Sequence, residues 1–526
     1  MAQPPSALRS ALFVSIARVL STILALLLGM LSADYFGASA AKDSYLIALT
    51  IPGLLTTFLT GGVYTSLLVT LMEIGRREGV SGQVAFMRRT LVSLAMAFMP
   101  FLLPAILLPR LLIEVVAPGF DTERLELSSR LLPITALTAL AALGFLIVRC
   151  LFQTRSHFAV PNFVFLAIPL TSLVTLVALV GRAGIFALAL GPLLGSVLAL
   201  ALLFVLIPGT LKDPPGFAPD PEPPEERAAR RRRFWLALLP MSIGANFGQI
   251  NLMIDNAFAS YLPTGAITLL GFAFVIISNT ELLTTLSLAE VAFPRLASAA
   301  LRGPEDLLAT FRWSLRYMVL MTAPLAAGAL AFGLPLVRLL FQRGEFDAAS
   351  TVGVTRLLAC YSLEIFFMGY LVLFSRVLFA RKRFALVTWT SAAAILANAV
   401  LDYLLMWRFG VNGIALATTC VALLHALLLA PLVRREVLVL HTPEDRRFVF
   451  KVVASAALMG GVVFLWTWVY ERNLDVSRET VRFVEVGTGL LLGGFSYVTF
   501  LHLLGIDEAR AVVRRIAESV PLLSPW

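Results

Sequence analysis

Ionisable side chains inside the apolar stretches of this sequence are the residues with the most potential for chemistry. Arg18 is a single cation within the first long apolar run, and acidic residues stand in later runs, at Asp255, Glu281, Glu290 and Asp402. A charge at the centre of a bilayer costs roughly 3 kcal/mol or more. Each of these side chains is therefore expected to face a cavity or a partner.

A polar stretch near residue 250 is the best candidate for the wall of such a cavity. Asn246, Gln249, Asn251 and Asp255 occur at spacings that can share one broad face of a helix. The sequence predicts that this face lines a cavity between membrane spans.

The acidic residues further along the chain allow two interpretations each. Glu281 and Glu290 form an acidic pair in one apolar run, and this pair could bind a coupling cation or pair with Arg18. Asp402 could belong to a similar ion or ion-pair site, or could cap or end its own helix. The sequence leaves both questions open.

Several other chemistries are not supported. Three cysteines, Cys150, Cys360 and Cys420, lie in or beside apolar runs, and the four histidines have no ligand spacing, so neither a disulfide framework nor a metal site is expected. A Gly-rich loop followed by Lys-Ser or Lys-Thr is missing from the sequence, so ATP hydrolysis by this chain is not expected either. No cofactor is predicted.

The composition determines which elements position these residues. The chain has 526 residues, of which 59% are hydrophobic and 14% charged, and its mean hydropathy is +0.88. Continuous apolar runs of about 20 residues, each able to cross about 30 Å of hydrocarbon, occur from one end to the other. Backbone groups in lipid must be hydrogen-bonded internally, so these runs are predicted to be helices. The fold class is an all-α polytopic membrane protein.

About fourteen spans are predicted from the apolar runs and their polar breaks. They begin near residues 9, 44, 87, 129, 159, 184, 234, 264, 309, 350, 384, 411, 448 and 480. Arginine and lysine are about two to three times as frequent in alternate connections, which predicts that both termini are cytoplasmic. The net charge of +10 therefore reflects the orientation of the chain in the membrane and does not indicate nucleic-acid binding. Four arginines near cytoplasmic ends, Arg149, Arg155, Arg376 and Arg381, are expected to be interfacial anchors.

Two segments of the chain repeat each other. Phe120-Asp121 and the later Arg130-Leu131-Leu132 recur 226 positions on, as Phe346-Asp347 and Arg356-Leu357-Leu358. Two further blocks recur in the same order: "RCLFQTRSHFA" with "RVLFARKRFA", and "GIFALALGPLLGSVLALALL" with "GIALATTCVALLHALLLAPL". The Phe-Asp and Arg-Leu-Leu elements are expected to start and orient a helix, because acidic residues suit a helix N-terminus.

The repeat predicts two homologous lobes of six spans each. Because six is even, both lobes cross the membrane in the same sense, and such parallel repeats commonly hold a transported substrate between them. The predicted organisation has an N-terminal lobe at 1–209, a cytoplasmic Pro/Arg-rich linker at 210–233, a C-terminal lobe at 234–435, and two further spans with a cytoplasmic tail at 436–526. The arginine run of the linker is expected to lie at anionic lipid headgroups.

The sequence also resembles a known family. The stretches "FGASAAKDSYLIALTIPGLL", "APGF", "FPRLASAALRG", "LFQRGEFDA", "RVLFARKRFA" and "NGIALATT" are similar to characteristic stretches of the MurJ (MviN) family of lipid II flippases, within the multidrug/oligosaccharidyl-lipid/polysaccharide exporter superfamily. The resemblance covers essentially the whole chain. It implies fourteen helices in two lobes plus a C-terminal pair.

The resemblance also implies a function. Family members move undecaprenyl-pyrophosphate-linked disaccharide pentapeptide from the inner to the outer leaflet of the bacterial cytoplasmic membrane for peptidoglycan synthesis. The membrane potential or an ion gradient is thought to drive them. The resemblance implies that Arg18, in "ARVLS", is one of the cavity arginines that meet the substrate, and that Asp43, in "AAKDSY", matches a family aspartate after the first span.

This sequence differs from the family at positions that bear on the cargo. Thr56 and Thr57 stand where family members usually have two arginines, and Gly61 stands where a glutamate is typical. A cavity with fewer cations would suit a less anionic headgroup, so the alternatives are a flippase for another lipid-linked oligosaccharide and a cation-coupled drug or metabolite antiporter. A membrane glycosyltransferase and a scaffold for cell-wall synthesis enzymes are hypotheses from other classes.

Overall fold

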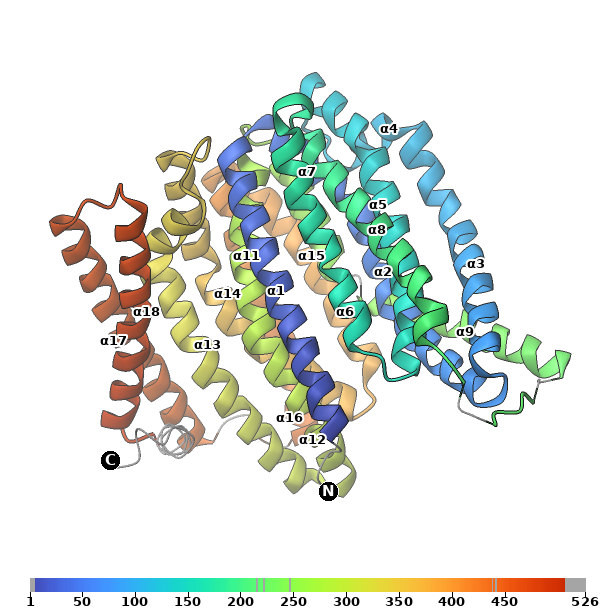
Figure 1. Ribbon diagram of the computed structural model, residues 1–526. Coiled ribbons are helices and arrows are strands. Elements are labelled where there is room, and N and C mark those ends of the chain that lie inside the picture. Colours follow the sequence, from blue (N-terminus) through green and yellow to red (C-terminus); the bar gives the residue numbers. More distant parts are fainter. Residues whose placement is uncertain are drawn as a thin grey trace. The chain divides into compact units, whose positions relative to one another are not determined.

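The computed structural model describes residues 5–506 except 214–215, 221–222, 246, 438 and 440–441, and it does not describe the side chains of residues 5–12, 58–62, 65 and 237–247. Within the described chain every regular element is a helix (Figure 1). Twelve segments are long and apolar enough to cross a membrane. They coincide with twelve of the fourteen predicted spans, and the other two, near residues 44 and 234, fall on helices with partly described side chains. The predicted all-α membrane fold is confirmed.

The helices form two compact units. The first runs to Thr268 and includes Arg343–Glu345, and the second comprises Leu269–Gln342 and continues from Phe346. Unit 1 contains α1 (Pro5–Phe36), α2 (Ala40–Arg77), α3 (Gly79–Leu107), α4 (Pro109–Val116), α5 (Thr122–Thr154), α6 (Ala159–Phe165), α7 (Ala167–Ala183), α8 (Phe186–Thr210), α9 (Pro224–Ala245) and α10 (Phe247–Ala259). The seventh predicted span, α9 with α10, packs in unit 1, while the division into lobes by the sequence repeat stays a prediction.

Unit 2 holds the remaining helices. They are α11 (Ala266–Glu281), the π-helix η1 (Leu282–Leu286), α12 (Ser287–Arg302), α13 (Pro304–Phe341), α14 (Ala348–Ala380), α15 (Phe384–Phe409), α16 (Val411–Val437), α17 (Pro443–Asn473) and α18 (Glu479–Leu503). The first residues of α11 belong to unit 1. Helix α13 packs against α14 and α17, and α17 packs against α18.

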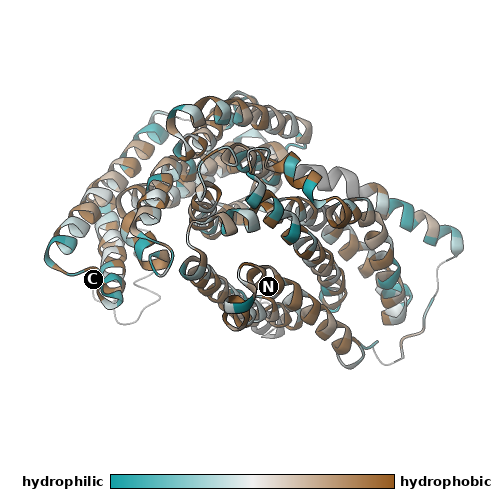
Figure 2. Cartoon of the chain, turned by 90° about the horizontal axis from the view of Figure 1, so that it is seen from above, coloured by the Kyte–Doolittle hydropathy of each residue, from teal (hydrophilic) through white to brown (hydrophobic). Residues whose placement is uncertain are grey.

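Each unit has its own core. In unit 1, α2 packs against α5 and α5 against α8, and Leu67, Met87, Phe152 and Leu203 are fully buried among them. The core of unit 2 joins α12, α13, α14, α16, α17 and α18. Hydrophobic residues continue around the outer sides of the helices in Figure 2, as expected where the surrounding solvent is lipid.

The sequence repeat is visible in the helix geometry of both units. Helices α5 and α14 each contain 33 residues. Asp121 accepts a hydrogen bond from the backbone N–H of Arg124 at 2.8 Å, and Asp347 accepts one from Ser350 at 2.7 Å. The two aspartates are therefore N-caps. This confirms that the repeated Phe-Asp elements start these helices, and the following Leu131, Leu132, Leu357 and Leu358 are fully buried.

The repeat extends to the other ends of the same helices. Ser156 (φ 60°) and Lys382 (φ 57°), two residues after α5 and α14, both adopt left-handed backbone conformations. Arg155 pairs with Asp213 at 2.9 Å, and Arg381 pairs with Glu436 at 2.8 Å. These two arginines, expected to be interfacial anchors, thus join α5 to the chain after α8, and α14 to the end of α16.

The two capping aspartates give a test by substitution and pH. Asp121→Ala and Asp347→Ala are each expected to lower the free energy of unfolding by about 1 kcal/mol, because an N-cap is lost. Backbone hydrogen bonds from Arg124 and Ser350 hold the pKa of Asp121 and Asp347 below its ordinary value. Their contribution to the free energy of unfolding is therefore fully present at pH values above the ordinary aspartate pKa of about 4. It is lost as the pH falls through the lowered pKa. Thermal unfolding in detergent between about pH 7 and pH 3 measures both effects.

The matched controls are Asp121→Asn and Asp347→Asn, because asparagine caps helices well without titrating. Asp347→Asn should unfold like the unsubstituted chain at neutral pH and lose less stability below about pH 4, whereas Asp121→Asn keeps the cap but also loses the ion pair with Arg124. Equal losses for alanine and asparagine at neutral pH would contradict the capping role.

Candidate functional site

Asp43 lies in the first turn of α2, and its side chain is fully buried. Its carboxylate accepts hydrogen bonds from the backbone N–H groups of Gly265 (2.7 Å) and Thr268 (2.8 Å) and from the Thr268 hydroxyl (2.6 Å). These donors belong to the start of α11, which begins at Ala266. The Asp43 carboxylate therefore caps α11 from a neighbouring helix. This contact favours a structural role for Asp43 over a place on a cavity wall.

Arg124 extends this contact to α5, and sequence reasoning missed it. The Arg124 Nη1 atom lies 3.9 Å from Asp43, and Nε lies 2.9 Å from Asp121. The guanidinium also lies over the Phe120 ring, 4.6 Å from its centroid. Arg124 is 7% exposed although "DTERLE" reads as a solvated helix start. Only the 226-residue repeat pointed to this segment.

The polar residues of α10 divide between two sides of the helix. A turn takes 3.6 residues, so Asn251 and Asp255 share one side, while Gln249 and Asn256 share another. The second side faces α2: the Gln249 Oε1 atom lies 3.5 Å from the position a Cβ would take at Gly53, and the Asn256 amide donates to the Thr50 hydroxyl at 3.4 Å. Gln249 thus faces α2, and the place of Asn251 and Asp255 on a cavity wall stays a prediction. Asn246 lies outside the described residues.

Arg18 lies on α1 in unit 1, where it is exposed. Few described residues of this helix are buried, and Phe13, Ile16 and Val19 are exposed apolar side chains on it. Arg18 and the acidic pair Glu281 and Glu290 belong to different units. Their pairing stays a prediction.

Glu281 and Glu290 have different surroundings. Glu281 ends α11 and is partly buried, and among the described residues its Oε1 atom has no hydrogen-bond partner. Glu290, in the first turn of α12, is exposed. Between them lies the π-helix η1, which sequence reasoning did not foresee. π-Helical turns occur frequently at functional sites.

Asp402 is fully buried in the interior of α15, and so is Asn398, one turn before it. The Asn398 amide donates to the Asp402 carboxylate at 2.8 Å. Helix α15 continues to Phe409 and ends at Gly410. Asp402 therefore does not end its helix, which removes one of the two interpretations from the sequence. The buried carboxylate and amide offer oxygen atoms of the kind that bind small cations.

A second group of buried charges joins α13, α17 and α18, and sequence reasoning missed it too. The Arg338 guanidinium donates to Glu471 at 2.5 Å and lies 4.0 Å from Glu485. Glu485 is fully buried, and within the described chain neither of its carboxylate oxygens has a hydrogen-bond partner. Glu471 and Glu485 lie 130 residues or more after Arg338 in the sequence, so only the fold brings them close to it.

Two further findings bound the chemistry of the site. Within the described part of the chain, no group of three or more histidine, cysteine, aspartate or glutamate side chains could hold a metal ion. A cleft of about 720 Å³ lies in unit 1 between α3 and α9, and none of the predicted site residues lines it.

Comparisons with known proteins assign the chain to a family. The family model described as lipid II flippase MurJ matches residues 32–485. A probable lipid II flippase MurJ of Vibrio cholerae is 25% identical, with 95% of this chain and 96% of that protein covered. A lipid II flippase MurJ of Burkholderia cenocepacia is 24% identical, with 94% and 98% covered.

Solved structures agree with this assignment at the level of the fold. A lipid II flippase MurJ in an inward closed conformation matches with a TM-score of 0.76 at 21% identity, over 94% of this chain and 99% of that one. An inward-facing multidrug resistance MATE family transporter of the MOP superfamily matches with a TM-score of 0.67 at 12% identity, over 79% and 94%. The family match covers most of the chain, and the chain therefore belongs to the MurJ family of lipid II flippases.

Proposed function

We propose that this chain is a flippase that moves an undecaprenyl-pyrophosphate-linked glycan, lipid II, from the inner to the outer leaflet by alternating access. The observation that carries the proposal is the family match over residues 32–485, which runs from the end of α1 into α18. The relatives that match over nearly their whole length bear the name lipid II flippase or probable lipid II flippase.

The chain resides in the bacterial cytoplasmic membrane with both termini in the cytoplasm. The arginine distribution supports this orientation: arginines gather at the α2–α3 turn, after α5 and α14, and at the start of α9. The opposite ends carry the aspartate-capped starts of α5 and α14. Anionic lipid headgroups at the cytoplasmic face and cell-wall synthesis enzymes are the further partners of this proposal.

The membrane potential or a monovalent cation drives transport in this proposal. Asp402 with Asn398 is one candidate for the cation site, since both are fully buried inside a span. Glu281 is the other, because its Oε1 atom has no hydrogen-bond partner among the described residues and the π-helix η1 follows it. A buried carboxylate that binds a cation avoids the cost of an isolated charge.

A second candidate function has one specific observation in its favour. Thr56 and Thr57 lie in α2 where family members usually have arginines, and each hydroxyl is neutral. Such a chain would carry another lipid-linked oligosaccharide with a less anionic headgroup, or work as a cation-coupled antiporter. The similarity in fold to a MATE family transporter agrees with the latter.

Depletion and complementation test the cargo. Depletion is expected to leave lipid II in the inner leaflet, where an enzyme added outside the cell cannot reach it. The chain is expected to rescue a conditional lipid II flippase mutant. Unchanged lipid II topology, together with failed rescue by a chain present at normal abundance, would contradict the lipid II proposal and leave the second candidate.

Arg18→Ala is expected to reduce transport about tenfold or more at normal protein abundance. A guanidinium that meets a phosphate-bearing headgroup makes charge-assisted hydrogen bonds worth about 1.5–3 kcal/mol. Arg182→Ala removes an exposed cation at the end of α7 and is the control. Equal activity of the two variants would show that Arg18 does not meet the cargo.

Asp402→Asn tests the cation site. The variant keeps the size of the side chain and removes its charge, so an imposed cation gradient is expected to accelerate transport about tenfold less in reconstituted vesicles. Asp475→Asn, in the exposed connection between α17 and α18, serves as the control. If the response to the gradient survives in Asp402→Asn, coupling does not use this carboxylate.

A further inference from the structure

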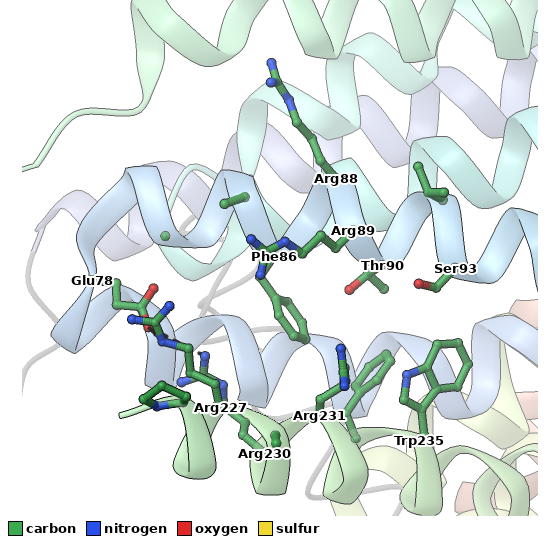
Figure 3. Close-up of a pocket in the computed structure, with 16 residues that line it drawn as sticks. Glu78, Phe86, Arg88, Arg89, Thr90, Ser93, Arg227, Arg230, Arg231 and Trp235 are labelled. Atoms are coloured by element: carbon green, nitrogen blue, oxygen red, sulfur yellow. Dashed lines mark ion pairs between the residues drawn. The ribbon is translucent and has the colours of Figure 1, made fainter. Parts of the chain in front are cut away.

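The cleft between α3 and α9 gives the anionic lipid headgroups of the proposed function a specific place in the fold, and the inference rests on the cytoplasmic orientation proposed there. It has a volume of about 720 Å³ and lies between the first turns of the two helices (Figure 3). Six of its lining residues are ionisable, five arginines and one glutamate: Arg88, Arg89, Arg227, Arg230, Arg231 and Glu78. The cleft thus carries a net charge of +4, which attracts anions.

The charges separate into two groups along the cleft. At one end Glu78 lies 3.8 Å from Arg227 and 3.7 Å from Arg230, so one of these two positive charges is offset. Arg89 and Arg231 are exposed, and among the described residues no carboxylate pairs with either. These two cations remain available to a ligand.

Hydroxyl groups line the cleft beside the available cations. Thr90 and Ser93 point from α3 into the space between the helices, and Trp235 rises from α9 opposite them (Figure 3). Thr90 is only 4% exposed. Guanidinium groups with neighbouring hydroxyl donors are the usual ligands of phosphate oxygens.

The cleft opens onto an apolar surface. Val92 lines it and is 57% exposed, and Met96, one turn further along α3, is 60% exposed. Trp235 also lines the cleft, and tryptophan is enriched at membrane–water interfaces. A ligand that fits both the basic cleft and the adjoining apolar surface has a phosphate at one end and hydrocarbon at the other.

Contacts from the connection before α9 hold the cleft in place. Asp213 accepts hydrogen bonds from the backbone N–H of Val80 at 2.9 and 3.0 Å, and Asp220 donates from its backbone N–H to the carbonyl of Arg77 at 2.8 Å. Glu226 pairs with Arg77 at 3.0 Å. The described part of this connection therefore packs against the α2–α3 turn, which brings α9 beside α3.

We propose that the α3–α9 cleft is a binding site for an anionic phospholipid of the surrounding bilayer. Its phosphate lies between Arg89 and Arg231 with the hydroxyls of Thr90 and Ser93 as donors, and its acyl chains follow α3 past Val92 and Met96. Basic pockets between helices at the cytoplasmic face commonly hold such headgroups. The site is independent of the glycan that the chain carries.

Native mass spectrometry of the full chain released from vesicles tests the site. Vesicles of phosphatidylglycerol with phosphatidylcholine are compared with vesicles of phosphatidylcholine alone, and cardiolipin is a third arm. The double variant Arg89→Gln/Arg231→Gln is expected to retain at least tenfold less phosphatidylglycerol. Arg232→Gln/Arg233→Gln is the matched control, because it removes the same charge from exposed positions of α9 that do not line the cleft.

A second variant separates the site from the stability of the fold. Ser93→Phe fills the cleft without changing its charge and should also lose phosphatidylglycerol, at an unchanged thermal unfolding temperature. If the variant of the lining arginines and the control variant retain equal amounts of phosphatidylglycerol, the lipid is attracted to the charged surface in general. That result would overturn the proposal. Displacement of the lipid by millimolar glycerol phosphate would also overturn it, since the ligand would then be a soluble phosphate.

Discussion

Satisfying the backbone at helix starts is the constraint on which the rest of this structure depends. The first turn of every helix leaves N–H groups without partners, and hydrocarbon supplies none. Aspartate meets this need five times in the described chain. Asp121 and Asp347 cap their own helices, Asp445 forms a capping box at α17, and Asp213 and Asp43 cap α3 and α11 from elsewhere in the chain. The sequence has twelve aspartates, so these five are a large share of them.

Several carboxylates inside the spans have no capping role and remain candidates for transport chemistry. Asp402 and Glu485 are fully buried and Glu281 is partly buried, and all three lie in unit 2. Unit 1 holds the capping residues Asp43, Asp121 and Asp213, and also Asp255, which is buried on α10. Carboxylates without a capping duty therefore occur in both units, and the two candidates for cation coupling proposed above, Asp402 and Glu281, are among those of unit 2.

The sequence predicted those parts of the fold that depend on local pattern. Apolar runs located the spans, and the repeated Phe-Asp element predicted the starts of α5 and α14, because a capping residue acts within three positions of itself. Features that depend on distant neighbours escaped it. Asp43 caps a helix more than 220 residues away, Glu485 meets Arg338 only through the packing of α18 on α13, and the two sides of α10 became clear only against α2. The π-helix after Glu281 could not be predicted either, because no periodic pattern in the sequence indicates it.

The lengths of α5 and α14 have a mechanical consequence. At 1.5 Å per residue, 33 residues extend about 50 Å, whereas the hydrocarbon layer is only about 30 Å thick. About 20 Å of each helix therefore reaches into the headgroup layers, shared between its capped start and its ion-paired end. A shift of a few ångström along the membrane normal leaves both ends hydrated. These two helices can therefore span bilayers of different thickness. In each case the carboxylates and guanidinium groups at their ends stay outside the hydrocarbon.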